Sequence, residues 1–277
     1  MFRSANVQIQ ETLNRTQHMK TPTHRKSLRT LLAISIALIG VPAPSHAVPV
    51  ALQNATATYS QYDLSLGWPF SVASAINGTA VDGLAWGIAH YTNNLGTHGG
   101  TFSESAAFET TANIGFASGS SLTFNLIQAF GAQHTIGRFR LSVTTDDRST
   151  FADGLINGGD VTANWTVLNP NSFTSANGAT LTKLGDFSIL ASGFLPDTDT
   201  YTVTAPTTLT GITGIRLELL EDASLPFNGP GRQPENGNLK LSEFTVDIVA
   251  VPEPTVLALV SAGSLLLAAR AKQNRDE

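Results

Sequence analysis

Apolar and polar residues alternate along several short stretches in the middle of the chain. In the stretch SLTFNL at residues 121–126, every second side chain is apolar and the others are polar. The same alternation recurs at residues 138–143, 187–189, 201–203 and 215–219. Successive side chains of a strand point to opposite faces, so this period of two predicts β-strands with one buried face. No window of this middle region has the spacing of an amphipathic helix.

Turn-forming pairs separate the predicted strands. They are Asn77-Gly78, Asp82-Gly83, Asn157-Gly158, Asn177-Gly178, Pro196-Asp197 and Asn236-Gly237. Strands joined by such turns, without interleaved helices, predict an all-β protein whose antiparallel sheets pack face to face as a β-sandwich. We expect one such domain over residues 48–250, a normal size for a single sandwich.

The composition excludes several classes of site and partner. The chain has no cysteine, so it cannot form disulfides, thiolate metal sites or a cysteine nucleophile. Residues 48–250 hold 7 Lys and Arg against 17 Asp and Glu, a net charge of −10. Nucleic-acid binding needs a positive surface for the phosphates, so this acidic body predicts no nucleic-acid partner.

The N-terminal 47 residues have the pattern of a secretory signal. Arg25, Lys26 and Arg29 precede an apolar run at residues 31–41, and small residues follow at Ser45 and Ala47. This order predicts a cleaved signal peptide with the cut after Ala47. The alternative is an N-terminal membrane anchor, but the apolar run is short for a span of roughly 20 residues. Met19 followed by Lys20 would be a more ordinary start than Met1.

The C-terminal residues 251–277 form a second targeting segment. Residues 256–269 carry no charge and predict a short hydrophobic helix, again shorter than the roughly 20 residues that a span needs. The basic residues Arg270, Lys272 and Arg275 follow and would stay on the cytoplasmic side. This arrangement predicts a protein that is held at the membrane through its C-terminal segment and faces outward.

This segment resembles the bacterial PEP-CTERM sorting signal. The resemblance rests on Val251, Pro252, Glu253 and Pro254, followed by the short apolar run and the basic tail. It implies recognition by an exosortase-type transpeptidase, cleavage near the Pro-Glu-Pro, and delivery to the cell envelope or extracellular polysaccharide. The tail ends in Asp276 and Glu277, a small departure from the usual pattern. A plain C-terminal anchor is the alternative.

The body, over roughly residues 55–249, resembles the galactose-binding-like (discoidin-like) sandwich, a jelly-roll fold. The resemblance rests on three groups of segments. They are residues 70–78 with Trp86-Gly87; residues 107–109, 121–124 and 134–143; and residues 229–232, 236–239 and 241–244. The early loop departs from the family pattern because residues 79–84 are inserted before Trp86.

The resemblance implies a structural Ca²⁺ between the early loop and the last strand. Calcium takes six to eight hard oxygen ligands. The loop offers the carbonyl of Ala75 and the side chains of Asn77 and Asp82, and the last strand offers Glu243. The alternation changes phase at Ser242-Glu243, which predicts a bulge there. Without a cation, Glu243 would simply turn to water at that bulge.

Three residues are candidate ligand contacts. Arg138 and Arg140 lie on one predicted strand face. They could bind an anionic sugar, pair with Glu109 or Glu218, or pack the aliphatic part of their side chains against the face of the sheet. Trp68 could stack on a sugar ring or be buried, whereas Trp86 is expected in the core.

We therefore interpret the chain as an exported, non-catalytic module that binds carbohydrate or polymer in the cell envelope or extracellular matrix. The sequence has no Gly-x-Ser-x-Gly elbow, phosphate loop or His-Glu-x-x-His. Two alternatives remain open: a structural matrix protein without a small ligand, and a glycan hydrolase, which would need two convergent carboxylates.

Overall fold

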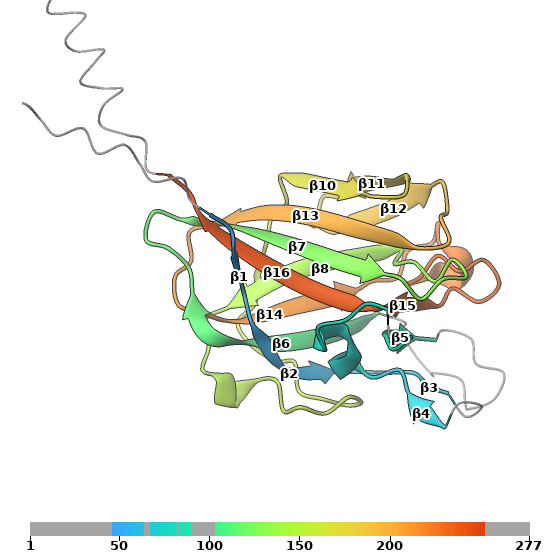
Figure 1. Cartoon of the computed structure of the whole chain (residues 1–277), viewed down its shortest axis with the longest axis horizontal. Coiled ribbons are helices and arrows are strands. Elements are labelled where there is room, and N and C mark those ends of the chain that lie inside the picture. Colours follow the sequence, from blue (N-terminus) through green and yellow to red (C-terminus); the bar gives the residue numbers. More distant parts are fainter. Residues whose placement is uncertain (1–45, 64–66, 82, 90–102, 253–277) are drawn as a thin grey trace, which may run out of the picture. The chain divides into compact units, whose positions relative to one another are not determined.

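A computed structural model describes residues 46–63, 67–81, 83–89 and 103–252. These residues form two antiparallel sheets that pack face to face (Figure 1). The predicted all-β antiparallel sandwich is therefore confirmed. The signal peptide and the C-terminal apolar segment lie outside the described residues and stay predictions.

The first sheet has five strands in the order β1-β16-β7-β13-β10. Their bounds are Val48–Pro49 (β1), Glu243–Ala250 (β16), Ser120–Gln128 (β7), Asp199–Thr207 (β13) and Ser172–Ser175 (β10). Along β7 buried and half-buried residues alternate at every position, because one face meets the second sheet and the other faces outward.

The second sheet has seven strands. Six follow the order β11-β12-β8-β14-β6-β2, and β9 pairs with β8 beside this path. Their bounds are Ala179–Lys183 (β11), Ile189–Gly193 (β12), Arg138–Thr144 (β8), Ile212–Leu219 (β14), Glu104–Ile114 (β6), Leu52–Ala57 (β2) and Thr166–Val167 (β9).

Two short strand pairs and three 3₁₀ turns complete the described part of the chain. The pairs are β15 (Leu239–Leu241) with β5 (Trp86–Ile88), and β3 (Tyr62–Asp63) with β4 (Trp68–Pro69). The turns are η1 (Val72–Ile76), η2 (Arg148–Thr150) and η3 (Pro226–Asn228). Within the described ranges, no helix has the length and apolar character that crossing a membrane would require.

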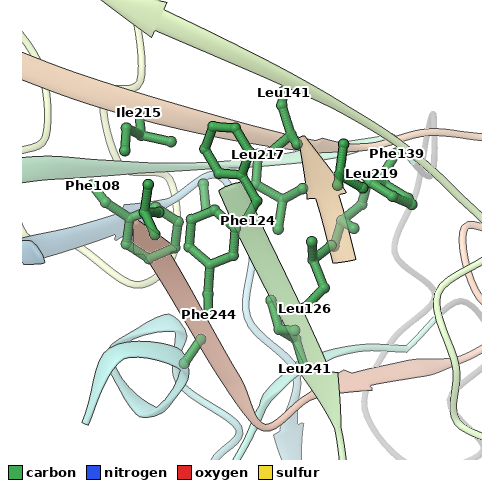
Figure 2. Packing of buried hydrophobic residues seen from close by; sticks show 14 of the residues in the cluster. Phe108, Phe124, Leu126, Phe139, Leu141, Ile215, Leu217, Leu219, Leu241 and Phe244 are labelled. Carbon is green, nitrogen blue, oxygen red and sulfur yellow. The ribbon is translucent and has the colours of Figure 1, made fainter. Parts of the chain in front are cut away.

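The core lies between the two sheets and is rich in aromatic rings. Phe244 of β16 lies 5.2 Å from the ring of Phe108 in β6 and 6.1 Å from that of Phe124 in β7. Figure 2 shows these rings beside Leu126, Leu141 and Leu217. All of them come from alternating positions of their strands, so the period of two places the apolar residues of both sheets in one core.

Four of the five alternating windows lie inside strands, and the fifth was assigned wrongly. Of residues 187–189, only Ile189 belongs to β12. Phe187 has a φ of 65° in a turn, and Asp186 accepts hydrogen bonds from the backbone and hydroxyl of Ser188. This local carboxylate turn overrides the apolar alternation.

The bulge predicted at Ser242-Glu243 is wrong, because the chain changes its partner strand there instead. β15 ends at Leu241 and pairs with β5, whereas β16 begins at Glu243 and pairs with β7. Ser242 joins them, and its backbone donates to the carbonyl of Ile127. The alternation therefore shifts because the chain moves from the two-stranded β15–β5 pair into the five-stranded sheet.

Both ends of the domain emerge side by side. Val48 of β1 pairs with Ile248 of β16, and the backbone of Val251 donates to the carbonyl of Gly119 at 3.0 Å. Ala47 is exposed directly before β1, and Val251 and Pro252 are exposed after β16. Glu253 and Pro254 lie outside the described residues.

Candidate functional site

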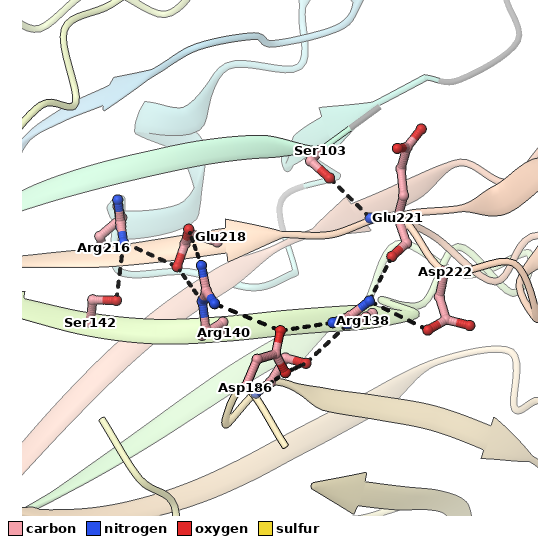
Figure 3. Close-up of polar contacts among 10 residues, drawn as sticks. Ser103, Arg138, Arg140, Ser142, Asp186, Arg216, Glu218, Glu221 and Asp222 are labelled. Atoms are coloured by element: carbon pink, nitrogen blue, oxygen red, sulfur yellow. Dashed lines mark hydrogen bonds and ion pairs between the residues drawn. The ribbon is translucent and has the colours of Figure 1, made fainter. Parts of the chain in front are cut away.

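Charged side chains gather on the outer face of the seven-stranded sheet. We call Arg138, Arg140, Asp186, Arg216, Glu218 and Asp222 the charged cluster (Figure 3). Its three arginines and Glu218 arise from alternation: β8 and β14 bury their apolar residues toward the core, so the residues between them point outward. Asp186 and Asp222 come from the adjoining loops. Register then sets Arg140 directly opposite Glu218.

Glu218 joins two arginines. Its Oε2 and Oε1 accept from Arg140 Nε at 2.8 Å and Nη2 at 2.9 Å. Its Oε2 also lies 3.2 Å from Arg216 Nη2. The parallel pair of bonds to Arg140 fixes both side chains more firmly than a single contact would.

Arg138 anchors the other end of the charged cluster. Its Nη2 donates to Asp186 Oδ2 at 2.8 Å, its Nε to Ser188 Oγ at 3.0 Å, and its Nη1 to the carbonyl of Glu221 at 3.0 Å. Asp222 Oδ2 lies 3.5 Å from Nη1. The side chains of Arg138, Arg140 and Arg216 keep exposed fractions of 22%, 24% and 18%, so all three remain accessible from solvent.

Hydrogen bonds favour the charged forms of Arg140 and Asp222. Hydrogen bonding to Glu218 raises the pKa of Arg140. A hydrogen bond from the Ser224 hydroxyl lowers the pKa of Asp222. Burial lowers the pKa of Arg216, against the pull of Glu218. Three arginines face three carboxylates in the charged cluster, so its net charge is zero.

A loop carries an aromatic residue onto the same face. The β8–β9 loop (residues 145–165) packs Phe151 and Trp165 over the sheet, and the Trp165 ring lies 5.1 Å below the Arg216 guanidinium. Phe151 rests on Gly214 of β14, where a Cβ would lie 2.4 Å from the end of its ring. The missing side chain at Gly214 therefore allows the loop to approach the sheet.

The same loop lines a polar cleft of about 400 Å³. It is lined by Asn54, Glu109, Arg148, residues 149–153 and Asp160. We call this hollow the polar cleft.

The predicted ligand residues do not all lie together. Arg138 and Arg140 lie in the charged cluster, and Arg140 makes the pair with Glu218 that the sequence left open. Trp68 lies in β4, and the structure describes its backbone but not its side chain. Trp86 is fully buried, as expected, and its ring nitrogen donates to the carbonyl of Tyr59 at 3.0 Å.

The structure brings the early loop and the last strand together, as the calcium prediction requires. Glu243 is buried, and its Oε2 accepts from the backbone of Gly78 at 3.2 Å. Asn77 Oδ1 accepts from the backbone of Thr79, and Ala75 is buried in η1. Asp82 lies outside the described residues. The described part of the chain contains no group of three His, Asp or Glu side chains arranged to hold a metal, so the ion stays a prediction.

Sequence reasoning reached only part of this face. The alternation at residues 215–219 placed Arg216 and Glu218 on one strand face, and Glu218 was named as a possible partner of the arginines, but Arg216 was not recognised as a member of the group. No sequence signal marks Asp186 or the polar cleft, because their positions depend on loops that fold onto the sheet. Trp165 was a candidate stacking aromatic by residue type, but its place beside Arg216 also depends on such a loop.

Comparisons with known proteins add little to this description. No family model matches the chain, and no curated relative matches it. One of the solved structures that match is a chain described under the Streptococcus pneumoniae β-galactosidase BgaA, with 13% identity and a TM-score of 0.41. The match covers 74% of this chain and 92% of that one. Similarity this low says nothing about ligand or activity.

Proposed function

We propose that the protein is an exported, non-catalytic module that binds a neutral glycan of the envelope or extracellular matrix on the outer face of the seven-stranded sheet. The observation that carries the proposal is the charged cluster beside Trp165. It combines accessible arginines and carboxylates, held in fixed positions, with an aromatic ring on one open face.

The chemistry of the charged cluster suits sugar hydroxyls. A hydroxyl both donates and accepts hydrogen bonds, and the cluster offers guanidinium donors next to carboxylate acceptors. The ion pairs already hold these side chains in place, so less conformational entropy is lost on binding. The zero net charge of the cluster favours an uncharged glycan over an anionic one.

The ends of the chain support export. The signal-like residues 1–47 and the PEP-CTERM-like residues 251–277 flank a domain whose two ends emerge side by side. We propose that an exosortase-type transpeptidase processes the C-terminal segment after transient membrane anchoring, and that the domain then works at the cell surface or in the matrix.

The proposal extends to a structural Ca²⁺ at Ala75, Asn77, Asp82 and Glu243. The contact between Gly78 and Glu243 supports it, because this contact brings the loop and the strand together. A bound ion would stabilise the folded state by binding it preferentially. Chelation should then lower the melting temperature, and an unchanged melting temperature would remove the ion from the proposal.

A glycan array probed with the full chain tests the proposal. We expect binding to at least one neutral polysaccharide, and about tenfold weaker binding, or about 1.4 kcal/mol, for Arg140→Gln. Lys183→Gln is the matched control, since it removes one exposed positive charge in β11, outside the charged cluster.

Other outcomes point to the alternatives. An array without any bound glycan would favour a structural matrix protein. Shortened oligosaccharides after incubation would instead show a hydrolase.

A further inference from the structure

Hydrogen bonds to neighbouring side chains and backbone hold the polar groups of the cleft in place. Glu109, in β6, is buried with an exposed fraction of 7%. Its two oxygens accept from Gln53 Nε2 and Asn54 Nδ2, each at 2.9 Å. Asn54 Nδ2 also donates to the carbonyl of Ala152. These bonds tie the floor of the cleft in β2 and β6 to its wall in the β8–β9 loop.

The polar cleft also carries a positive group. Arg148 donates from Nε to the carbonyl of Thr110 at 2.8 Å, from Nη2 to Thr110 Oγ1 at 3.1 Å, and from Nη1 to Asn113 Oδ1 at 2.9 Å. A guanidinium has five N–H groups, so these three bonds leave two for a ligand.

The carboxylates of the polar cleft keep acceptor capacity. A carboxylate offers about four acceptor positions. The described bonds use two on Glu109, two on Asp153 through the backbones of Leu155 and Asp160, and one on Asp160 through the backbone of Thr162. The cleft therefore presents several acceptors and a few donors within one concave volume.

The polar cleft and the charged cluster lie on the same sheet face, and aromatic rings connect them. Phe151 lines the cleft and meets Trp165 edge-on at 5.5 Å, and Trp165 lies under Arg216 of the charged cluster. A chain-like ligand on the charged cluster would thus have the cleft as a neighbouring pocket.

We propose that the polar cleft is a second saccharide subsite, which takes one neutral sugar ring of the glycan that the charged cluster binds. This inference rests on the proposed function. Mixed acceptors and donors in a hollow suit the hydroxyls of a pyranose ring. Glu109, Asp153 and Asp160 outnumber Arg148, and the resulting negative charge disfavours uronic acids and phosphorylated sugars.

Saturation-transfer NMR on the full chain tests the subsite. The probes are glucose, galactose, mannose and N-acetylglucosamine, with glucuronic and galacturonic acid as charged counterparts. We expect at least one neutral sugar to bind and its uronic counterpart to bind at least tenfold more weakly. Asp160→Asn and Thr150→Trp should each weaken the neutral sugar at least tenfold. The first removes a charged acceptor, and the second places an indole at the mouth of the cleft.

Controls separate the two proposals. Glu235→Gln removes an exposed carboxylate in the loop before β15 and should leave binding unchanged. Thermal melting of each variant checks that it folds. If Thr150→Trp does not fold, Asp160→Asn still tests the site. Unchanged sugar binding in Asp160→Asn, or no binding of any neutral sugar by the natural chain, would overturn the subsite. The glycan array with Arg140→Gln would still decide the proposed function.

Discussion

At the scale of single residues, Glu218 holds the charged cluster together. It accepts two hydrogen bonds from Arg140 and also contacts Arg216, and its side chain is 10% exposed. Arg140 has another carboxylate, Asp186, only at 3.7 Å. Loss of Glu218 would therefore leave two largely covered guanidinium groups without their nearest carboxylate, which is costly in a partly buried site.

The two members of this pair should differ when truncated. We expect Glu218→Ala to lower the free energy of unfolding by about 2–4 kcal/mol. Arg140→Ala should cost about 1–2 kcal/mol, because Glu218 keeps its contact with Arg216. Urea denaturation measures both. Equal losses, or a larger loss for Arg140→Ala, would contradict the central role of Glu218.

At the scale of strands, the alternation of β16 points Phe244 into the core between the sheets. This ring contacts Phe108 of the facing sheet and Phe124 of its own sheet, so one side chain joins three strands. Its packing depends on the shift at Ser242, which places Phe244 inward while β15 keeps Leu241 inward as well.

Truncation of Phe244 should open a cavity between the sheets. We expect Phe244→Ala to lower the free energy of unfolding by about 3–5 kcal/mol. Phe116→Ala is the matched control, since Phe116 is 39% exposed in the β6–β7 turn, and it should change stability by about 0.5 kcal/mol or less. Chemical denaturation of both variants measures the two changes in the free energy of unfolding. Similar losses would show that the core does not depend on this ring.

Alternation predicted strands well where one face of the strand is apolar and buried and the other is polar and points outward. The windows in β7, β8, β13 and β14 each have a buried side and an outward side, and their assignments were confirmed. Residues 187–189 failed because the Asp186 side chain organises a turn. The polar cleft was beyond sequence reasoning, since Asn54 and Ala152, which meet in it, are 98 positions apart.

At the scale of the whole molecule, the sandwich buries a titratable group in its centre. Tyr201 of β13 is fully buried, and its hydroxyl donates to the carbonyl of Ile136 at 3.1 Å. Burial raises the pKa of Tyr201 from 10.0 to about 12. The folded state therefore holds this proton more tightly than the unfolded chain does.

This burial predicts a loss of stability in alkali. The contribution of Tyr201 is fully present below pH 10 and is lost as the pH rises toward 12; a shift of two units is worth about 2–3 kcal/mol. Melting temperatures between pH 8 and 12 should fall less steeply for Tyr201→Phe, although that variant loses the hydrogen bond to Ile136. Parallel curves for the two proteins would exclude this origin.

The position of β16 also decides how the domain resists a mechanical force. β16 pairs with β7 over all eight of its residues, from Glu243 to Ala250. A pull at Pro252 along the axis of β16 would load this ladder in shear, so its hydrogen bonds would share the force. A pull between Val48 and Val251 would instead peel β1 from β16 one bond at a time. If the proposed C-terminal tether exists, force along β16 would act on the longer of these two ladders.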